Sequence, residues 1–268
     1  MEAPTPTIHD VAKKSGVSTA TVSRCLNSPA QVTEKTRIKV MAAVVELGYT
    51  PNFGARAMAA RRTNTIGAII PTMENAIFAR GLQAFQEELA THGFTMLVAS
   101  TSYQPEQEDV QIRSLVARGA DALLLIGHDR APSIYKFLDA QQVPALVTWS
   151  FDPEVARPSV GFDNRAAMQE MAEAVIAQGH RNIAFITADI AINDRTRARL
   201  AGIRDAMTYS GMNPDDLRVI ETPYGIDNGA MAFKELMRSN VRPTAVLCAN
   251  DVLAVGAMRQ ARAMGIDV

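Results

Sequence analysis

From Thr65 onward, short apolar runs alternate with longer amphipathic stretches, and this alternation limits the chain to few folds. The runs have strand length and are apolar throughout, which is typical of strands buried on both faces of a parallel sheet. The predicted strands are Ile66–Ile70, Thr95–Ser100, Ala122–Ile126, Ala145–Trp149, Ile183–Thr187, Val219–Glu221 and Val246–Ala249. The predicted helices are Phe78–His92, Glu106–Arg118, Ser133–Gln141, Ala166–Gln178, Arg197–Ser210, Gly229–Arg238 and Asp251–Met264. This order predicts an α/β fold with doubly wound parallel sheets.

The alternation restarts after Ser159–Asp163, so the sequence predicts two lobes in series, residues 65–160 and 161–268. Two such lobes usually bind a ligand in the crevice at the carboxyl ends of their strands. Polar or aromatic residues follow several predicted strand ends, namely Met73–Phe78, Trp149, Asp163–Asn164 and Asn250–Asp251. Each alone is more typical of a loop or a helix cap, and Asn250 in particular would cap the helix that follows.

The segment Thr7–Asn27, TIHDVAKKSGVSTATVSRCLN, predicts two short helices joined by a tight turn. Thr7 suits the N-cap of the first helix, Gly16 its end, and Ser18 the N-cap of the second. The second helix turns Val22, Cys25 and Leu26 inward, which leaves Thr19, Ala20, Ser23 and Arg24 facing out. Short side chains with one Arg allow a helix to enter the DNA major groove closely. An ordinary helical hairpin with a solvated outer face fits the same pattern.

A third helix is predicted to begin after Thr33, as its cap, and to end at Gly48, which closes a head of residues 1–48. Its expected inner face is Ile38, Met41, Ala42, Val45 and Leu47. The hinge that follows, residues 49–64, contains Arg56, Arg61 and Arg62 and a short stretch too weak to form a stable helix alone. We therefore expect an anionic partner for the hinge.

The charge is unevenly distributed along the chain. Residues 1–62 hold nine basic and four acidic side chains, a net +5, whereas residues 63–268 hold 18 and 24, a net −6. A basic head on an acidic body indicates that the head meets a polyanion and the body does not. We find no apolar run of membrane-spanning length and no signal peptide, and Cys25 and Cys248 show no redox or metal spacing. A cytoplasmic protein without a membrane partner is expected.

At this point the sequence resembles the lactose-repressor (LacI/GalR) family of bacterial transcription regulators. The resemblance is carried in the head by TIHDVAKKSGVSTATVSRCLN, VTEKTRIKVMAAVVELGYTPN and NFGARAMA. In the body it is carried by ARGADALLLIG, QQVPALV, VGFDN, QGHRNIAFITA, RARLAGIRDAM, RPTAVLCANDVLAVGAMR and AMGIDV. The resemblance implies a helix-turn-helix head with a hinge helix, and a periplasmic-binding-protein-like core. It further implies a homodimer whose paired heads bind a pseudo-palindromic double-stranded operator.

The resemblance also implies which residues contact DNA. Thr19 and Ala20 match the two positions that choose bases, and Arg24 matches an Arg at the DNA surface. Met58 stands where the family usually has the Leu that wedges into the minor groove. The full implied set is Thr7, Ser18, Thr19, Ala20, Ser23, Arg24, Asn27, Tyr49, Asn52 and Met58.

For a small-molecule effector, the resemblance implies Phe78 as a packing aromatic, Arg199 as the gripping cation and Asn250 as a hydrogen-bonding amide. Tyr224 and Trp149 match aromatic positions that line the cleft, with rim or core packing as the alternative for both. Aromatic faces beside Arg and Asn suit a sugar or sugar acid. No cofactor and no metal are implied.

Family members continue beyond the position of Val268, so we expect an incomplete second lobe that binds effector weakly. Two other functions are open. A solute-binding module without DNA function would not explain the basic head. An enzyme on a doubly wound sheet would need a nucleotide-binding or nucleophile motif, and we find none. An effector-controlled transcriptional regulator, acting as a repressor, is the leading prediction.

Overall fold

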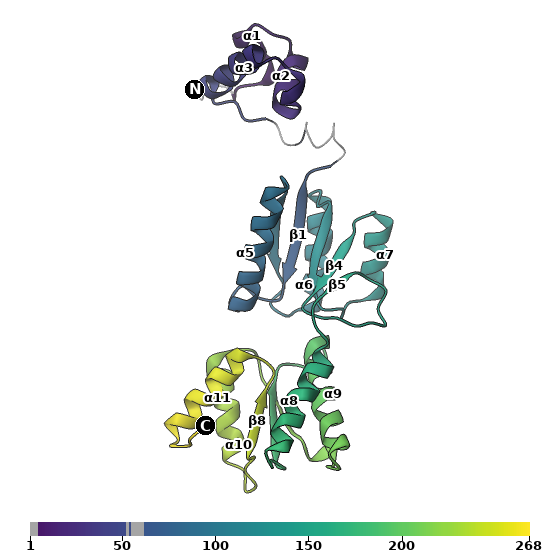
Figure 1. The fold of residues 1–268 in the computed structure, drawn as a ribbon, viewed down its shortest axis with the longest axis vertical. Helices are drawn as coiled ribbons and strands as arrows, with labels where there is room; N and C mark the ends of the chain where they lie inside the picture. The colour runs from purple at the N-terminus through teal and green to yellow at the C-terminus, as the bar shows by residue number, and fades with distance from the viewer. Residues whose placement is uncertain (1–4, 52–53, 55–61) are drawn as a thin grey trace. The chain divides into compact units, whose positions relative to one another are not determined.

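The computed structural model describes residues 5–51, 54 and 62–268, and the chain divides into two compact units, residues 1–63 and 64–268. The first unit holds α1 (Ile8–Ser15), α2 (Thr19–Asn27), the short 3₁₀ helix η1 (Pro29–Gln31) and α3 (Glu34–Leu47), drawn in purple in Figure 1. The predicted hinge residues Asn52 and Met58 lie outside the described residues.

The first helix begins at a reciprocal cap. The Thr7 backbone N–H donates to the Asp10 carboxylate at 2.8 Å, while the Asp10 N–H donates to the Thr7 hydroxyl oxygen at 3.4 Å. The Thr7 hydroxyl also donates to this carboxylate and so lowers the pKa of Asp10. Gly16, with φ +66°, ends the helix in the left-handed conformation that glycine adopts without strain. The turn between α1 and α2 therefore follows from local sequence.

The predicted inner face of α3 is wrong except at Leu47. Ile38, Met41 and Val45 are 60%, 41% and 78% exposed, whereas Val40 is fully buried and Ala43 nearly so. Val40 and Ala43 pack with Val11, Val22 and Cys25, and the partly buried Val44 and Leu47 join them. The helix is apolar on two sides, so its sequence periodicity does not distinguish the face that contacts α1 and α2. Thr33 holds the N-cap position, but its hydroxyl pairs with that of Thr36 at 3.0 Å rather than with a backbone N–H.

The first lobe of the second unit is a five-stranded parallel sheet of order β2-β1-β3-β4-β5. Its strands are β1 (Thr65–Ile70), β2 (Thr95–Ser100), β3 (Ala122–Ile126), β4 (Ala145–Thr148) and β5 (Ser159–Val160), and its helices are α5 (Ala76–Thr91), α6 (Pro105–Ala117) and α7 (Pro132–Ala140). Ile69, Leu123 and Leu125 pack with α6 and α7, while Ala68, Ile70, Leu124 and Ile126 pack with α5. Alternate side chains thus bury both faces of the sheet, which confirms the doubly wound prediction.

The second lobe is a three-stranded parallel sheet of order β7-β6-β8 within one continuous core. Its strands are β6 (Ile183–Thr187), β7 (Arg218–Glu221) and β8 (Ala245–Cys248). Its helices are α8 (Asn164–Ala177), α9 (Asp194–Tyr209), α10 (Ile226–Met237) and α11 (Asp251–Ala263) (Figure 1). The 3₁₀ turn η2 (Pro214–Asp216) precedes β7. In both lobes the carboxyl ends of the parallel strands carry loops whose polar side chains form the features described next.

Candidate functional site

The outer surface of α2 consists of short side chains and one cation. Ala20 and Arg24 are exposed, and Thr19 and Ser23 are half-buried, while Val22 and Cys25 lie in the head core. Ser18 caps the helix, because its hydroxyl oxygen accepts the Thr21 N–H at 3.2 Å. The helix thus presents the predicted reading face to solvent.

The other described residues of the predicted DNA-contacting set lie in the same unit as this helix. Thr7, Ser18 and Asn27 are exposed, and Asn27 donates its side-chain amide to the Ser23 hydroxyl at 3.2 Å. Tyr49 is half-buried and packs on the head core directly after α3. The described members of the set therefore share one unit of the chain, and several are already tied to a neighbour within it.

A cavity of about 780 Å³ in the second unit is lined by loops from both lobes and is called the interlobe cavity. Its lining residues from the first lobe are Thr72, Glu74, Asn75, Ser102 and Tyr103, and those from the second are Ala188, Asp189, Ile192, Asn193, Glu221, Thr222, Pro223, Tyr224, Gly225 and Val252. Of the predicted effector residues, this cavity contains Tyr224.

Tyr224 is held from two sides. Its ring lies 5.1 Å from the ring of Tyr103, measured between centroids, across the boundary of the two lobes. Its hydroxyl is within hydrogen-bond distance of the Thr196 hydroxyl at 3.1 Å and accepts from the Asn193 amide at 3.5 Å. Because Thr196 is fully buried and Asn193 nearly so, their contacts restrain the position of the tyrosine hydroxyl. Burial raises the pKa of Tyr103 above its usual value, so this ring stays neutral.

Arg199 and Asn250 line a second, smaller hollow of about 480 Å³ beside β8, here called the β8 groove. Arg199 donates from Nη1 to the Ala249 carbonyl oxygen at 2.6 Å, and burial lowers the pKa of its guanidinium from the usual value. Asn250 caps α11 by accepting the Leu253 N–H on Oδ1 at 3.0 Å, so its capping role is real. The groove therefore contains a guanidinium and an amide from neighbouring segments.

Asn164 joins them in the β8 groove and was not predicted as an effector residue. It is 3% exposed, and its side-chain amide donates to the carbonyl oxygens of Trp149 at 3.1 Å and Phe162 at 3.3 Å. Its Oδ1 is buried and has no hydrogen-bond partner among the residues that the structure describes. A buried acceptor without a partner is uncommon and costs about 1–3 kcal/mol unless another group donates to it.

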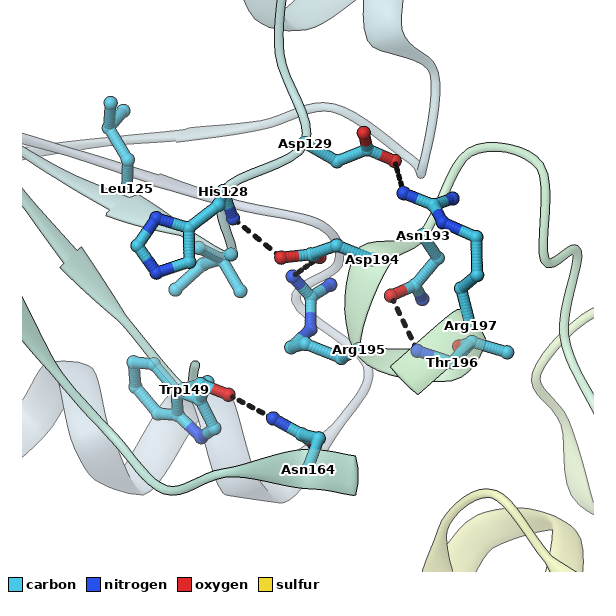
Figure 2. Close-up of polar contacts among 12 residues, drawn as sticks. Leu125, His128, Asp129, Trp149, Asn164, Asn193, Asp194, Arg195, Thr196 and Arg197 are labelled. Atoms are coloured by element: carbon cyan, nitrogen blue, oxygen red, sulfur yellow. Dashed lines mark hydrogen bonds and ion pairs between the residues drawn. The ribbon is translucent and has the colours of Figure 1, made fainter. Parts of the chain in front are cut away.

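Phe78 and Trp149 occupy a different place from the other three predicted residues. Phe78 is 6% exposed in the core of the first lobe, and its ring meets that of Trp149 edge-on at 5.4 Å between centroids. Trp149 has φ +60°, which ends β4 one residue earlier than predicted, and its carbonyl accepts the Asn164 amide (Figure 2). The structure thus brings together Arg199 and Asn250, and separately Phe78 and Trp149.

Comparison with known proteins places this geometry in a family. Residues 7–52 match the bacterial regulatory proteins of the lacI family, and residues 63–268 match the periplasmic binding proteins and sugar binding domain of the LacI family. The transcriptional regulator GntR of Escherichia coli (strain K12) is 31% identical over 263 residues, which are 98% of this chain and 78% of GntR. The chain belongs to the LacI family.

Solved structures of family members agree in fold. A LacI-family regulator from Silicibacter pomeroyi matches with a TM-score of 0.87 and 28% identity, over 98% of this chain and 79% of that one. The lac repressor dimer, bound to operator and the anti-inducer ONPF, matches with a TM-score of 0.84 and 27% identity, over 99% and 80%. The chain is accordingly a DNA-binding transcriptional regulator with the sugar-binding domain of its family, and not an enzyme.

Two further findings concern the described residues alone. None of their helices is both long enough and apolar enough to span a membrane. None of their histidine, cysteine and acidic side chains gather in a group of three or more that could hold a metal ion.

Sequence reasoning missed Tyr103 and Asn193, although both follow strand ends of the parallel sheets. The rule that singled out Trp149 and Asn250 also covers Tyr103, which stands three residues beyond the end of β2 at Ser100. Asn193 would have been found as the cap of α9 had the start of that helix been placed correctly, at Asp194 rather than Arg197.

Proposed function

We propose that this LacI-family chain is an effector-controlled repressor that acts as a homodimer on a pseudo-palindromic operator. A head of residues 1–48 reads DNA, a hinge of residues 49–64 follows it, and lobes of residues 65–160 and 161–268 bind the effector in the cytoplasm. The exposed face of α2 supports the first part, because its short side chains allow the helix backbone to approach base edges.

For base selection we propose Thr19 and Ala20, at the amino-terminal end of α2, where helix-turn-helix proteins place their base contacts. Arg24 lies one turn further along and is exposed, which suits a phosphate contact. Thr7, Ser18, Ser23, Asn27, Tyr49, Asn52 and Met58 complete the proposed DNA-contacting set.

For the effector we propose a carbohydrate-derived molecule, a sugar or sugar acid. The observation that carries this is the β8 groove, which Asn164, Arg199 and Asn250 line together. A sugar hydroxyl can accept from the Arg199 guanidinium and donate to a side-chain amide oxygen of the groove, and a carboxylate would pair with Arg199. Tyr224 supplies an aromatic face from the interlobe cavity, and Phe78 and Trp149 pack edge-on against each other in the first lobe.

The test begins with operator selection from random duplex DNA, followed by fluorescence anisotropy of the full chain on the selected site. We expect a salt-sensitive affinity that depends on both half-sites. A panel of sugars and sugar acids is then screened for release of the DNA and for a thermal shift. Arg199→Ala should reduce the affinity for the active compound at least tenfold.

The matched control is Arg204→Ala, because Arg204 is exposed on the same helix, outside the β8 groove. It should leave effector affinity unchanged. An effector that binds the Arg199→Ala and Arg204→Ala variants equally well would contradict the proposed groove, and a chain that selects no duplex would contradict the repressor.

A further inference from the structure

The first turn of α9 is fastened to the first lobe by a carboxylate. Asp194 accepts the backbone N–H of His128, which follows β3 in the first lobe, on Oδ2 at 2.6 Å. Its other oxygen, Oδ1, accepts from Arg195 Nη1 at 2.9 Å. Figure 2 shows Asp194 between the His128 amide and the Arg195 guanidinium. The Asp194 and Arg195 side chains are only 17% and 11% exposed, so this contact is shielded from competing water.

The first lobe is shaped to receive this carboxylate. Gly127 has φ +70°, and a Cβ atom at this position would overlap Arg195 Nη1 and the Asp194 carboxylate. Any larger residue would therefore drive these side chains away from the loop after β3. Beside this contact, Arg197 donates from Nη2 to Asp129 at 3.0 Å and joins the same two segments at the exposed edge (Figure 2).

The first two turns of α9 and its cap also position two of the proposed effector-binding residues, Tyr224 and Arg199. Asn193 and Thr196 hold the Tyr224 hydroxyl, and Arg199 reaches the β8 groove five residues after Asp194. A displacement of the start of α9 relative to the first lobe would therefore move Tyr224 and Arg199 together. Packed helices move as units, because interiors are dense and deform little.

We propose that Asp194 is a positioning residue that couples the arrangement of the two lobes to effector binding. Its carboxylate, at the start of α9, accepts the His128 amide in the space that Gly127 leaves free by having no Cβ atom. This inference rests on the proposed effector function, since its consequence is the placement of Arg199 and Tyr224. Asp194 itself contacts a backbone amide and Arg195 and need not touch the effector.

The experiment uses the full chain without effector. Asp194→Ala should increase hydrogen exchange of the His128 amide on the order of tenfold or more, because a charge-assisted hydrogen bond is lost. It should also broaden the distance distribution between spin labels on Lys136→Cys in α7 and Tyr209→Cys in α9, in a background without native cysteines. Asp194→Asn keeps an acceptor for the amide and should restore most of the protection. Gly127→Ala, made in the other lobe, should reproduce the broadening.

The matched control is Asp205→Ala. Asp205 lies on the same helix and pairs with Arg165 Nη2 at 3.0 Å, but both residues belong to the second lobe. It should change neither measurement. Equal behaviour of the Asp194→Ala and Asp205→Ala variants, or unchanged distances in Gly127→Ala, would overturn the coupling. Exchange and distances need no ligand, so they test the lobe arrangement separately from the proposed effector. A compound from the effector screen that binds Asp194→Ala as tightly as Asp205→Ala would overturn the coupling to effector binding.

Discussion

The head and the two-lobed core hold their polar side chains in opposite ways. On α2 they are short, accessible to solvent and borne by a single helix of nine residues. In the β8 groove, Asn164, Arg199 and Asn250 are recessed and come from the starts of α8 and α11 and from the second turn of α9. The first arrangement suits a rigid polymer that lies across the protein surface. The second suits a small molecule whose hydroxyls replace water as hydrogen-bond partners.

The two regions also form separate compact units, which predicts separate responses to a core mutation. Val40 is fully buried in the head, so Val40→Asp places an unpaired carboxylate in an apolar core and should cost more than about 4 kcal/mol. We expect loss of operator binding and of amide protection over residues 8–47. The single tryptophan, Trp149, lies in the other unit, and its fluorescence transition in urea should be unchanged.

Val45→Asp is the control for this prediction. Val45 is on the same helix but 78% exposed, so the same change should alter head stability by no more than about 0.5 kcal/mol. A shift of the Trp149 transition in Val40→Asp would show that the two units unfold as one, which would contradict the separation of the head from the two-lobed core.

The shielding of the core can be measured at Cys248, which lines the β8 groove. Burial raises the pKa of its thiol from 9.0 to about 11. The thiolate is the reactive form, so at pH 8 this shift lowers the reactive fraction by about a hundredfold. Alkylation of Cys248 by iodoacetamide, followed by peptide mass mapping, should be slow at pH 8 and accelerate as the pH rises toward 11. A rate equal to that of the urea-unfolded chain would mean that the groove is as open as the surface of α2.

The same contrast explains which features the sequence predicts. The helix boundaries of the head depend on caps such as Thr7 and Gly16, which act within one turn, and they were predicted correctly. The inner face of α3 depends on which of two apolar sides meets α1 and α2, and periodicity could not decide between Val40 and Val45. In the core, the seven predicted strands lie within a residue of the observed ones, whereas the two-residue β5 was not among them. The partners of Phe78 and Arg199 lie in the same lobe as each of them, so these contacts depend on strand order. Asp194 is paired with His128 across 66 positions, a contact with no local pattern.

Two substitutions on the exposed face of α2 distinguish base selection from phosphate binding. Exchanging Thr19 and Ala20 for each other should change the preferred base pairs while leaving the salt dependence of binding unaltered. Arg24→Ala should weaken binding to every operator by about tenfold and reduce the salt slope by about one. Both are measured by anisotropy on a set of half-site variants over a range of salt concentrations. A swap without effect on base preference would show that bases are read elsewhere than at the start of α2.

The smallest expected effect distinguishes two caps within the head. The Ser18 hydroxyl oxygen accepts the Thr21 N–H, so Ser18→Ala should destabilise the head by about 1 kcal/mol. The Thr33 hydroxyl instead pairs with that of Thr36, and Thr33→Ala should cost less than about 0.5 kcal/mol because no backbone N–H loses its acceptor. Urea unfolding of the head, followed by hydrogen exchange without DNA, measures both. Equal losses would mean that Thr33 caps α3 in solution, as its position in the sequence predicts, and that the start of α3 is set by the same local rule as that of α2.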